Sequence, residues 1–412
     1  MARRSPLLPI FLIVLADVFG FTLVFPLLAI YAERLSATPL QATLLVSTYA
    51  ACQLVSGPIL GGLSDRFGRK PLLLVSQLGT FVGFVVMARA DVLWMMYLAR
   101  VLDGATAGNL SIAQAYISDN SAPENRAKSF AVIGIAFGVG FFIGPFVTAQ
   151  LATISLAAPV WAAAGLSLTS ILCTTFLLPG GPPPGKPAGD VGPGGTRPSV
   201  FRPRAYAHYF SRPVLGGLLL QFLFFSLAFS TFTSGFALFA ERRFTWHGAP
   251  FTPREIGYLF AWAGFLGILL QGVLGRLVKR FGEPRLVAVG FVSMAVGYLA
   301  LGFVRGVGEL LVVTTISSFG NAVLRPALSS LVSQRAERHE QGAVLGLNQS
   351  LNSAAQIVAP ALGGLLIEHG YLTPWAVVAA GAALCGFFAV RWGSGRAKPP
   401  TPMVRATVAE GQ

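Results

Sequence analysis

Four ionisable side chains lie inside long apolar stretches of this sequence: Asp17, Arg100, Asp103 and Arg325. A charge within the hydrocarbon of a membrane costs several kcal/mol, so such a group is a candidate for function. A carboxyl group held away from water favours its neutral form. Asp17 could therefore bind and release a proton, or it could be paired permanently with a base. Arg100 and Asp103 are three residues apart and can pair on one helix, so Arg100 either acts on Asp17 or is simply neutralised by Asp103. Asp17, Arg100 and Asp103 are the predicted proton-coupling residues.

Uncharged polar side chains follow one face of an apolar stretch near the C-terminus. Gln349, Asn352 and Gln356 are spaced three and four residues apart, so they share one face of a helix. A polar stripe opposite aromatic side chains suits an amphipathic organic molecule, although phenylalanines in such stretches also commonly face lipid. The predicted substrate-binding residues are Gln53, Asn109, Gln114, Gln221, Phe225, Arg325, Gln349, Asn352 and Gln356.

The elements that must hold these groups are apolar blocks of about 20 residues, the length that crosses hydrocarbon as a helix. The chain has 412 residues, of which 54% are hydrophobic and 11% charged. The first block continues past Tyr31 without a signal-peptidase site, so we expect it to be retained. We predict twelve membrane-spanning helices, at residues 9–31, 40–62, 71–89, 92–117, 128–152, 157–178, 213–240, 254–277, 286–304, 308–333, 342–367 and 374–392.

The net charge of +14 does not indicate binding to nucleic acid, because the basic residues are distributed as membrane topology requires. With the N-terminus inside, twenty of the thirty Lys and Arg residues fall in cytoplasmic segments, in agreement with the positive-inside rule. Both termini are therefore predicted to be cytoplasmic. Three distant cysteines and four histidines near loops give no disulfide framework, metal site or catalytic cluster. Six basic residues are predicted to lie outside: Arg34, Arg89, Arg242, Arg243, Arg254 and Arg305.

A segment rich in Pro and Gly divides the chain. Residues 179–198 contain seven Pro and seven Gly, a composition typical of a flexible linker. We predict an N-terminal half of six helices at 1–178, a cytoplasmic linker at 179–212, a C-terminal half of six helices at 213–393, and a cytoplasmic tail at 394–412.

A charged turn follows the second apolar block, and part of it recurs later in the chain. The turn is Gly61-Gly62-Leu63-Ser64-Asp65-Arg66-Phe67-Gly68-Arg69-Lys70, and five of its residues reappear within 275–282 at an offset of 214 residues. Thr38 and Thr252 are separated by the same offset, and each begins the pattern of a helix capping box. Two independent features at one offset indicate a duplicated half, as in transporters built from parallel repeats.

This turn resembles the signature loop between helices 2 and 3 of the major facilitator superfamily. The resemblance implies an all-α integral membrane fold with twelve transmembrane helices in two six-helix repeats. It also implies that Asp65 caps the cytoplasmic start of helix 11 and that Arg69 reaches an acid at the end of helix 4, where Asp119 is correctly placed. In the second copy Lys279 replaces Asp65 and Glu283 replaces Arg69, so we do not expect the same contacts there. The predicted gate residues are Gly61, Asp65, Arg66, Gly68, Arg69 and Asp119.

The resemblance is closest to the tetracycline and multidrug/proton antiporters of that family. Asp17 resembles their helix-1 acid, and Arg100 with Gly104 resembles a helix-4 motif of proton-linked members, from which Asp103 is a departure. The tetracycline antiporters also carry an acid in helix 3, and the stretch 79–83 has none here. A magnesium–tetracycline chelate is therefore not assumed to be the substrate.

The sequence predicts a secondary transporter of the inner (plasma) membrane that exports amphipathic organic compounds in exchange for protons by alternating access. The alternative is an importer or facilitator of a small metabolite or lysolipid with the same fold. We expect lipid, a small organic substrate and protons as partners, with no nucleic acid. We expect no cofactor, no enzymatic activity, and a monomer as the working unit.

Overall fold

The computed structural model describes residues 7–120, 126–179, 208–336 and 341–394, and the statements below concern these residues. Most of the predicted linker at 179–212 and nearly all of the predicted tail at 394–412 lie outside them. The N-terminal half contains α1 (Leu7–Val24), a 3-10 turn η1 (Phe25–Leu27), α2 (Leu28–Arg34), α3 (Pro39–Phe67), α4 (Arg69–Ala88), α5 (Leu93–Ala105), α6 (Asn109–Asn120), α7 (Arg126–Leu151) and α8 (Ala158–Leu177). The C-terminal half contains α10 (Pro213–Arg243), a small hairpin of β1 (Thr245–Trp246) and β2 (Ala249–Pro250), α11 (Pro253–Phe281), α12 (Glu283–Leu301), α13 (Val307–Arg335), α14 (Gln341–Glu368) and α15 (Leu372–Ser394).

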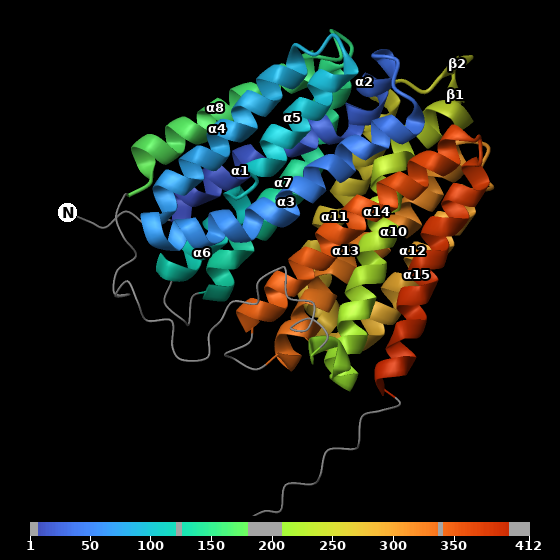
Figure 1. Cartoon of the computed structure of the whole chain (residues 1–412). Helices are drawn as coiled ribbons and strands as arrows, with labels where there is room; N and C mark the ends of the chain where they lie inside the picture. Colours follow the sequence, from blue (N-terminus) through green and yellow to red (C-terminus); the bar gives the residue numbers. More distant parts are fainter. Residues whose placement is uncertain (1–6, 121–125, 180–207, 337–340, 395–412) are drawn as a thin grey trace, which may run out of the picture.

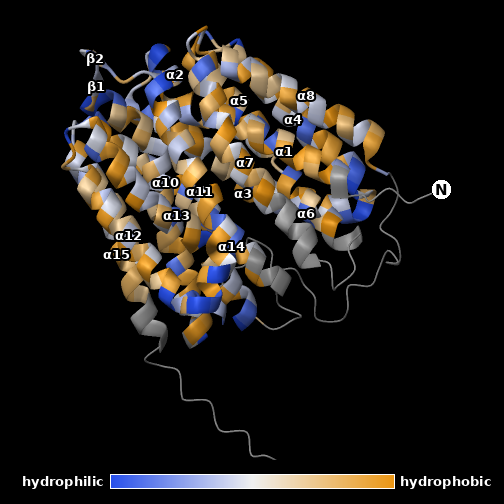
Figure 2. Ribbon diagram, turned by 180° about the vertical axis from the view of Figure 1, so that it is seen from behind, coloured by the Kyte–Doolittle hydropathy of each residue, from blue (hydrophilic) through white to orange (hydrophobic). Residues whose placement is uncertain are grey.

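Eleven helical segments of the described chain are long and apolar enough to cross a membrane. They coincide with eleven of the twelve predicted spans. Large apolar side chains cover their outer surfaces; for example, 79% of Phe176 and 60% of Val312 are exposed. Figure 2 shows this apolar cover along the helices, with hydrophilic residues gathered towards their ends. The fold is the predicted all-α membrane bundle.

The remaining span, predicted as one helix over 92–117, is two helices in the structure. α5 ends at Ala105 and α6 begins at Asn109, so the prediction of a continuous helix was wrong. Ser76 of α4 hydrogen-bonds to the backbone between these two helices. Its hydroxyl donates to the Thr106 carbonyl and accepts from the Gly108 N–H at 2.9 Å. Non-helical backbone is tolerated at membrane depth where protein covers it and satisfies its polar groups.

The duplicated half is confirmed by the element boundaries. α3 spans Pro39–Phe67 and α11 spans Pro253–Phe281, so both helices have 29 residues and begin 214 residues apart. Each begins with a capping box, at Thr38 and Thr252. Each is followed by a glycine with positive φ, 96° at Gly68 and 78° at Gly282. A side chain would be strained in this conformation, which explains why glycine occupies this position in both copies.

The two halves lie side by side and differ in separation at their two ends. We call the end that carries α2, β1 and β2 the α2 end, and the opposite end, where α8 finishes and α10 begins, the linker end. In Figures 1 and 2 the halves converge at the α2 end and separate towards the linker end. Two pairs of helices make the main contacts between the halves, α3 with α14 and α7 with α11.

Polar contacts between the halves, within the described residues, all belong to the part nearer the α2 end. Arg242 of α10 pairs with Glu33 of α2 at 2.6 Å. The Gln150 amide of α7 donates to the Tyr258 hydroxyl of α11 at 2.7 Å. Further contacts join α3 to α14. Towards the linker end, Leu63 of α3 and residues 271–273 of α11 are exposed. The molecule is therefore closed at the α2 end and open at the linker end.

Candidate functional site

Asp17 lies in α1, and its carboxyl group is surrounded by helices of the N-terminal half. Its Oδ1 atom is buried and has no hydrogen-bond partner among the described residues. The Ser170 hydroxyl of α8 lies near the carboxyl group and donates to the Ile13 carbonyl of α1 at 3.4 Å. Ser170 in turn accepts a hydrogen bond from the Gln77 amide of α4 at 2.8 Å. Asp17 therefore lies beside Ser170, which joins α8 to α1 and α4, while Oδ1 of its own carboxyl group remains unsatisfied.

Arg100 and Asp103 form a buried ion pair on α5. Arg100 Nη2 lies 3.5 Å from Asp103 Oδ2, and the two side chains are 6% and 10% exposed. The guanidinium group also lies over the rings of Tyr49 and Phe84, at 5.9 and 6.0 Å from their centroids, a geometry of cation–π attraction. Tyr49 is within electrostatic range of Asp17, Arg100 and Asp103. We call these four residues the acid cluster.

Asp103 is held against α4 in the stretch where the tetracycline antiporters would carry an acid. The Thr80 hydroxyl donates to Asp103 Oδ1 at 2.9 Å. Gly83 packs on the same residue, since a Cβ at Gly83 would lie 3.3 Å from the Cβ of Asp103. Stretch 79–83 has no carboxylate of its own, but a carboxylate from α5 contacts it. Asp103, which departs from the helix-4 motif, and the stretch of α4 that lacks the expected acid therefore lie against each other in the fold.

Sequence reasoning missed Ser170 and Thr80 as neighbours of the acid cluster. A sign was present in α8, where Ser167, Ser170 and Thr174 recur at helical spacing and are all buried. Such a row on an apolar helix indicates a polar face turned towards the protein. Nothing in the local sequence of Thr80 identifies its partner, because Asp103 is 23 residues away on another helix.

The charged turn joins α3 to α4 at the linker end. Arg69 Nη1 lies 2.5 Å from Asp65 Oδ1 and donates to the Ser64 hydroxyl at 2.7 Å. Lys70 Nζ donates to the Thr175 and Leu178 carbonyls at 2.8 Å each, which holds the start of α4 against the end of α8. Gly68 is the one residue between the two helices, whereas Gly61 lies within α3, so most of the sequence predicted as a turn is helical.

Fewer contacts are described for two other predicted gate residues, Arg66 and Asp119. The exposed Arg66 lies over the neighbouring Phe67 ring at 5.4 Å. Asp119 lies in α6, but its side chain is outside the part that the structure describes.

The second copy of this turn carries the opposite charge at the position of Arg69. Glu283, which replaces Arg69, accepts hydrogen bonds from the Ser330 hydroxyl at 2.6 Å and the Gln334 amide at 2.9 Å. Both donors lie near the end of α13. Glu283 therefore ties the start of α12 to the end of α13.

The predicted substrate residues are distributed between exposed and buried positions. Gln114, Arg325 and Gln349 are exposed, whereas Gln221, Phe225 and Asn352 are buried. Gln53 is half-buried and donates to the Tyr49 hydroxyl at 3.0 Å. Asn109 and Gln356 are half-buried, and Asn109 Oδ1 has no partner among the described residues. Phe225 packs between Phe222 and Phe229, so it is part of an aromatic core.

Two residues of the C-terminal half carry polar groups that have no described partner. Arg325 is exposed in the middle of α13 and makes no ion pair or hydrogen bond within the described residues. Asn348 of α14 is 5% exposed, and both polar atoms of its amide group are buried without a described partner. A buried amide group without partners is costly. Both residues therefore retain unused capacity for polar contacts.

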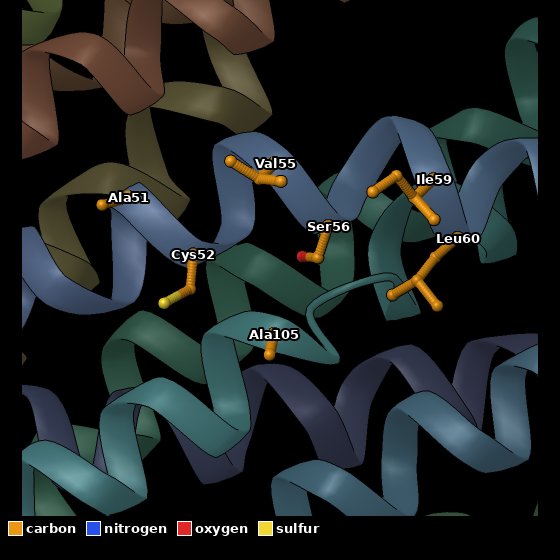
Figure 3. A pocket seen from close by; sticks show the side chains of 7 residues that line it. All are labelled: Ala51, Cys52, Val55, Ser56, Ile59, Leu60 and Ala105. Carbon is orange, nitrogen blue, oxygen red and sulfur yellow. The ribbon is translucent and has the colours of Figure 1, made fainter.

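A cavity of about 530 Å³ lies beside residues 51–60 of α3. Figure 3 shows Ala51, Val55 and Ile59 along one side of α3, with Cys52 and Ser56 turned towards α5. The Ser56 hydroxyl is occupied, since it donates to the Gly104 carbonyl at 2.6 Å. The cavity is therefore almost wholly apolar. None of the predicted substrate residues lines it. Its lining is Ala51, Cys52, Val55, Ser56, Ile59, Leu60 and Ala105.

Comparison with known proteins agrees with this arrangement. The family model of the Major Facilitator Superfamily matches residues 10–251 and 245–410. The chain belongs to this superfamily. It is therefore a multi-pass membrane transporter rather than an enzyme.

Drug-resistance proteins are among the curated relatives of this superfamily member. It is 31% identical to the "Tetracycline resistance protein, class C" of Escherichia coli over 372 residues, which cover 87% of this chain and 89% of the relative. It is 26% identical to "Multidrug resistance protein 2" of Bacillus subtilis (strain 168) over 368 residues, which cover 87% and 89%. The solved structure of the human organic anion transporter MFSD10 has the same fold, with a TM-score of 0.71, 23% identity, and 95% and 100% coverage. The chain lies within the drug-efflux branch of the superfamily.

The Arg100–Asp103 pair gives a first prediction. Removing one charge leaves the other buried without its partner, which is more costly than removing both. We expect Arg100→Met and Asp103→Leu each to lower the thermal unfolding temperature of the purified protein, and the double variant to recover most of the loss. Transport should remain absent in the double variant if the pair serves the proton reaction. A double variant that is folded and transports like the wild type would show that the two charges only neutralise each other and take no part in transport.

Proposed function

We propose that this transporter exports amphipathic organic compounds in exchange for protons by alternating access. The observation that carries the proposal is the buried Oδ1 atom of Asp17, which has no described hydrogen-bond partner within the acid cluster. An isolated carboxylate in a membrane protein is costly when charged and much less so when protonated. Proton binding at Asp17 therefore offers a source of free energy for moving one half against the other.

The orientation in the membrane follows from charge. In the described chain the turns at the linker end are rich in base, including Arg66, Lys70, Arg276, Lys279 and Arg285. At the α2 end, bases and acids alternate, as in Glu33-Arg34 and Glu241-Arg242-Arg243. By the positive-inside rule the linker end is cytoplasmic. The open state described here then faces the cytoplasm, where an exporter takes up its substrate. The membrane is the inner (plasma) membrane, both termini are cytoplasmic, and the monomer is the working unit.

In the proposed cycle the substrate enters from the cytoplasm while Asp17 releases its proton. The halves then close at the linker end and open at the α2 end. Substrate leaves, and a proton from outside returns to Asp17. Asp103, held by Arg100 and Thr80, adds an electrostatic repulsion to the effect of burial on that carboxyl group. The named relatives support export, since two of them are resistance proteins.

The substrate class we favour carries a negative group on an apolar body. Arg325 offers an exposed positive charge within a membrane span and has no described partner. Arginine is well suited to bind carboxylate or phosphate. The fold neighbour described as an organic anion transporter is consistent with such a substrate. The remaining candidate is an importer or facilitator of a small metabolite or lysolipid, and an Asp17 that never titrates would favour it.

Asp17→Asn tests the coupling. Because an amide cannot release a proton, we expect proton-driven uphill efflux in proteoliposomes to be abolished, while exchange of labelled substrate across the membrane persists. Asp91→Asn, a change at an exposed loop acid of the α2 end, serves as the control. Full uphill transport by Asp17→Asn would remove this residue from the mechanism.

Arg325→Gln tests the substrate class. A hydrogen bond to a charged group contributes about 1.5–3 kcal/mol, so binding of an anionic dye such as carboxyfluorescein should weaken about 10- to 100-fold. Binding of the cationic dye ethidium should not weaken. Arg335→Gln, at the exposed end of the same helix, is the matched control. Equal loss for anionic and cationic dyes would show that Arg325 serves the structure rather than the substrate charge.

The charged turn gives a prediction about the gate. The resemblance implies that Asp65 caps the start of α14 when the linker end is closed, and Lys279 cannot do the same for α7. Asp65→Asn should therefore shift the population towards the cytoplasm-open state, by about 1 kcal/mol for a charge at a helix N-terminus. Lys279→Asn should have little effect.

The distance between spin labels at Gly62 and Gly275 measures this population. Both positions tolerate a side chain, since an added Cβ meets no atom within 4 Å. The three native cysteines, Cys52, Cys173 and Cys385, are replaced in the background. Equal shifts for Asp65→Asn and Lys279→Asn would mean that the two turns contribute equally to the gate.

A further inference from the structure

Glu368 is the last residue of α14, and its carboxylate contacts the first turn of α3 in the other half. Its Oε2 atom accepts a hydrogen bond from the Thr38 hydroxyl at 3.0 Å and another from the Leu40 N–H at 3.1 Å. Pro39 has no N–H, and the Gln41 N–H is bound by the Thr38 hydroxyl oxygen. Within the described residues, Glu368 is the acceptor that satisfies the free N–H of Leu40. The C-terminal half thus completes a helix cap in the N-terminal half.

The backbones of these two helices are close together at this end. Gly364, one turn before Glu368, packs against the backbone of Pro39 and Leu40, and a side chain there would collide with Thr43. The Ser47 hydroxyl donates to the Ile357 carbonyl at 2.8 Å, two turns further along. The position of Glu368 is therefore fixed by several contacts and is not the chance reach of a long side chain.

The two helices run in opposite directions, so each ends beside the start of the other. α14 ends at Glu368 next to the start of α3, and α3 carries Asp65 in its last turn at the linker end, towards which the start of α14 faces. A helix N-terminus carries a partial positive charge and favours a carboxylate. Each member of this pair therefore has an acid placed for the N-terminus of the other, at opposite ends of the molecule.

The second pair, α7 with α11, lacks both acids. Lys279 occupies the place of Asp65, as the repeat offset shows. When Pro145 is aligned with Pro360, Thr153 takes the place of Glu368, and its hydroxyl donates to the Gln150 carbonyl of its own helix at 2.6 Å. This pair meets through close packing, since Gly257 lies against Pro145 and Ala149, and through the uncharged hydrogen bond from Gln150 to Tyr258.

We infer that Glu368 is the gate residue of the α2 end and the counterpart of Asp65. Its carboxylate caps α3 while the α2 end is closed, and this cap is lost when that end opens. Asp65 then caps α14 at the other end. The α3–α14 pair thus exchanges one carboxylate cap for the other during each cycle, while the α7–α11 pair moves without such an exchange. The inference rests on the alternating access of the proposed function, but not on its protons or its substrate.

The test measures the distance between labels at Gly62 and Gly275 in purified protein without substrate. Loss of the Glu368 cap should open the α2 end and close the linker end, so the short-distance population should grow. We expect the ratio of closed to open linker ends to rise about 2- to 5-fold in Glu368→Gln, which keeps an acceptor but loses the charge. Glu368→Ala, which also loses the acceptor, should give a larger rise.

Glu309→Gln and Glu309→Ala are the matched controls. Glu309 is an exposed acid of the same end, but it accepts the Arg305 N–H within its own half at 3.0 Å. Asp65→Asn should shift the ratio in the opposite direction, and Glu368→Gln with Asp65→Asn should return it towards the wild-type value. A ratio in Glu368→Ala equal to that of the Glu309 variants, or a shift towards the open linker end, would overturn the inference. Since no proton gradient or substrate is present, this outcome is separate from failure of the proposed efflux reaction.

Discussion

The interior of a membrane offers no hydrogen bonds to a polar group, and this constraint governs the whole molecule. Backbone groups must be paired within helices. In the break between α5 and α6, the Ser76 hydroxyl hydrogen-bonds to the Thr106 carbonyl and the Gly108 N–H. Arg100 is neutralised by Asp103, which is itself held by Thr80. Other groups of the described residues lack such partners: an oxygen of Asp17 and the amide group of Asn348 are buried without a hydrogen bond, and Arg325 has no described ion pair. Retention of such costly groups is explained if they change partners during function.

The same constraint gives different roles to the apolar contacts and the polar contacts between the halves. Within the membrane the halves meet mainly through apolar and glycine contacts, which allow one helix to move along another. The polar contacts that stabilise one conformation over the other lie at the ends of the helices. There, water can hydrogen-bond to the polar groups when a contact breaks. Arg242 with Glu33 and Glu368 with Thr38 are of this kind. The energy of each contact is therefore small, and two nearly equal states of the transporter remain accessible.

Local signals predicted much of this fold. The capping boxes at Thr38 and Thr252, and the glycines that end α3 and α11, depend on residues close in sequence, so the repeat and its offset could be predicted. The break at Thr106 could not, because it depends on Ser76, a residue 30 positions away on another helix. The neighbours of Asp103 and the partner of Glu368 depend on contacts of the same long-range kind. The position of Asp17 inside an apolar helix could be predicted from the local sequence alone, whereas its nearness to Ser170 of α8 could not.

The central claim is that substrate and a proton compete through Asp17. Proton release on binding tests it most directly: a transported dye is added to the purified protein in weakly buffered detergent solution, and the pH is recorded. The account predicts that wild-type protein releases protons as the dye binds, and that Asp17→Asn binds the dye without release. Equal proton release from both proteins, or dye binding without release in the wild type, would contradict the account.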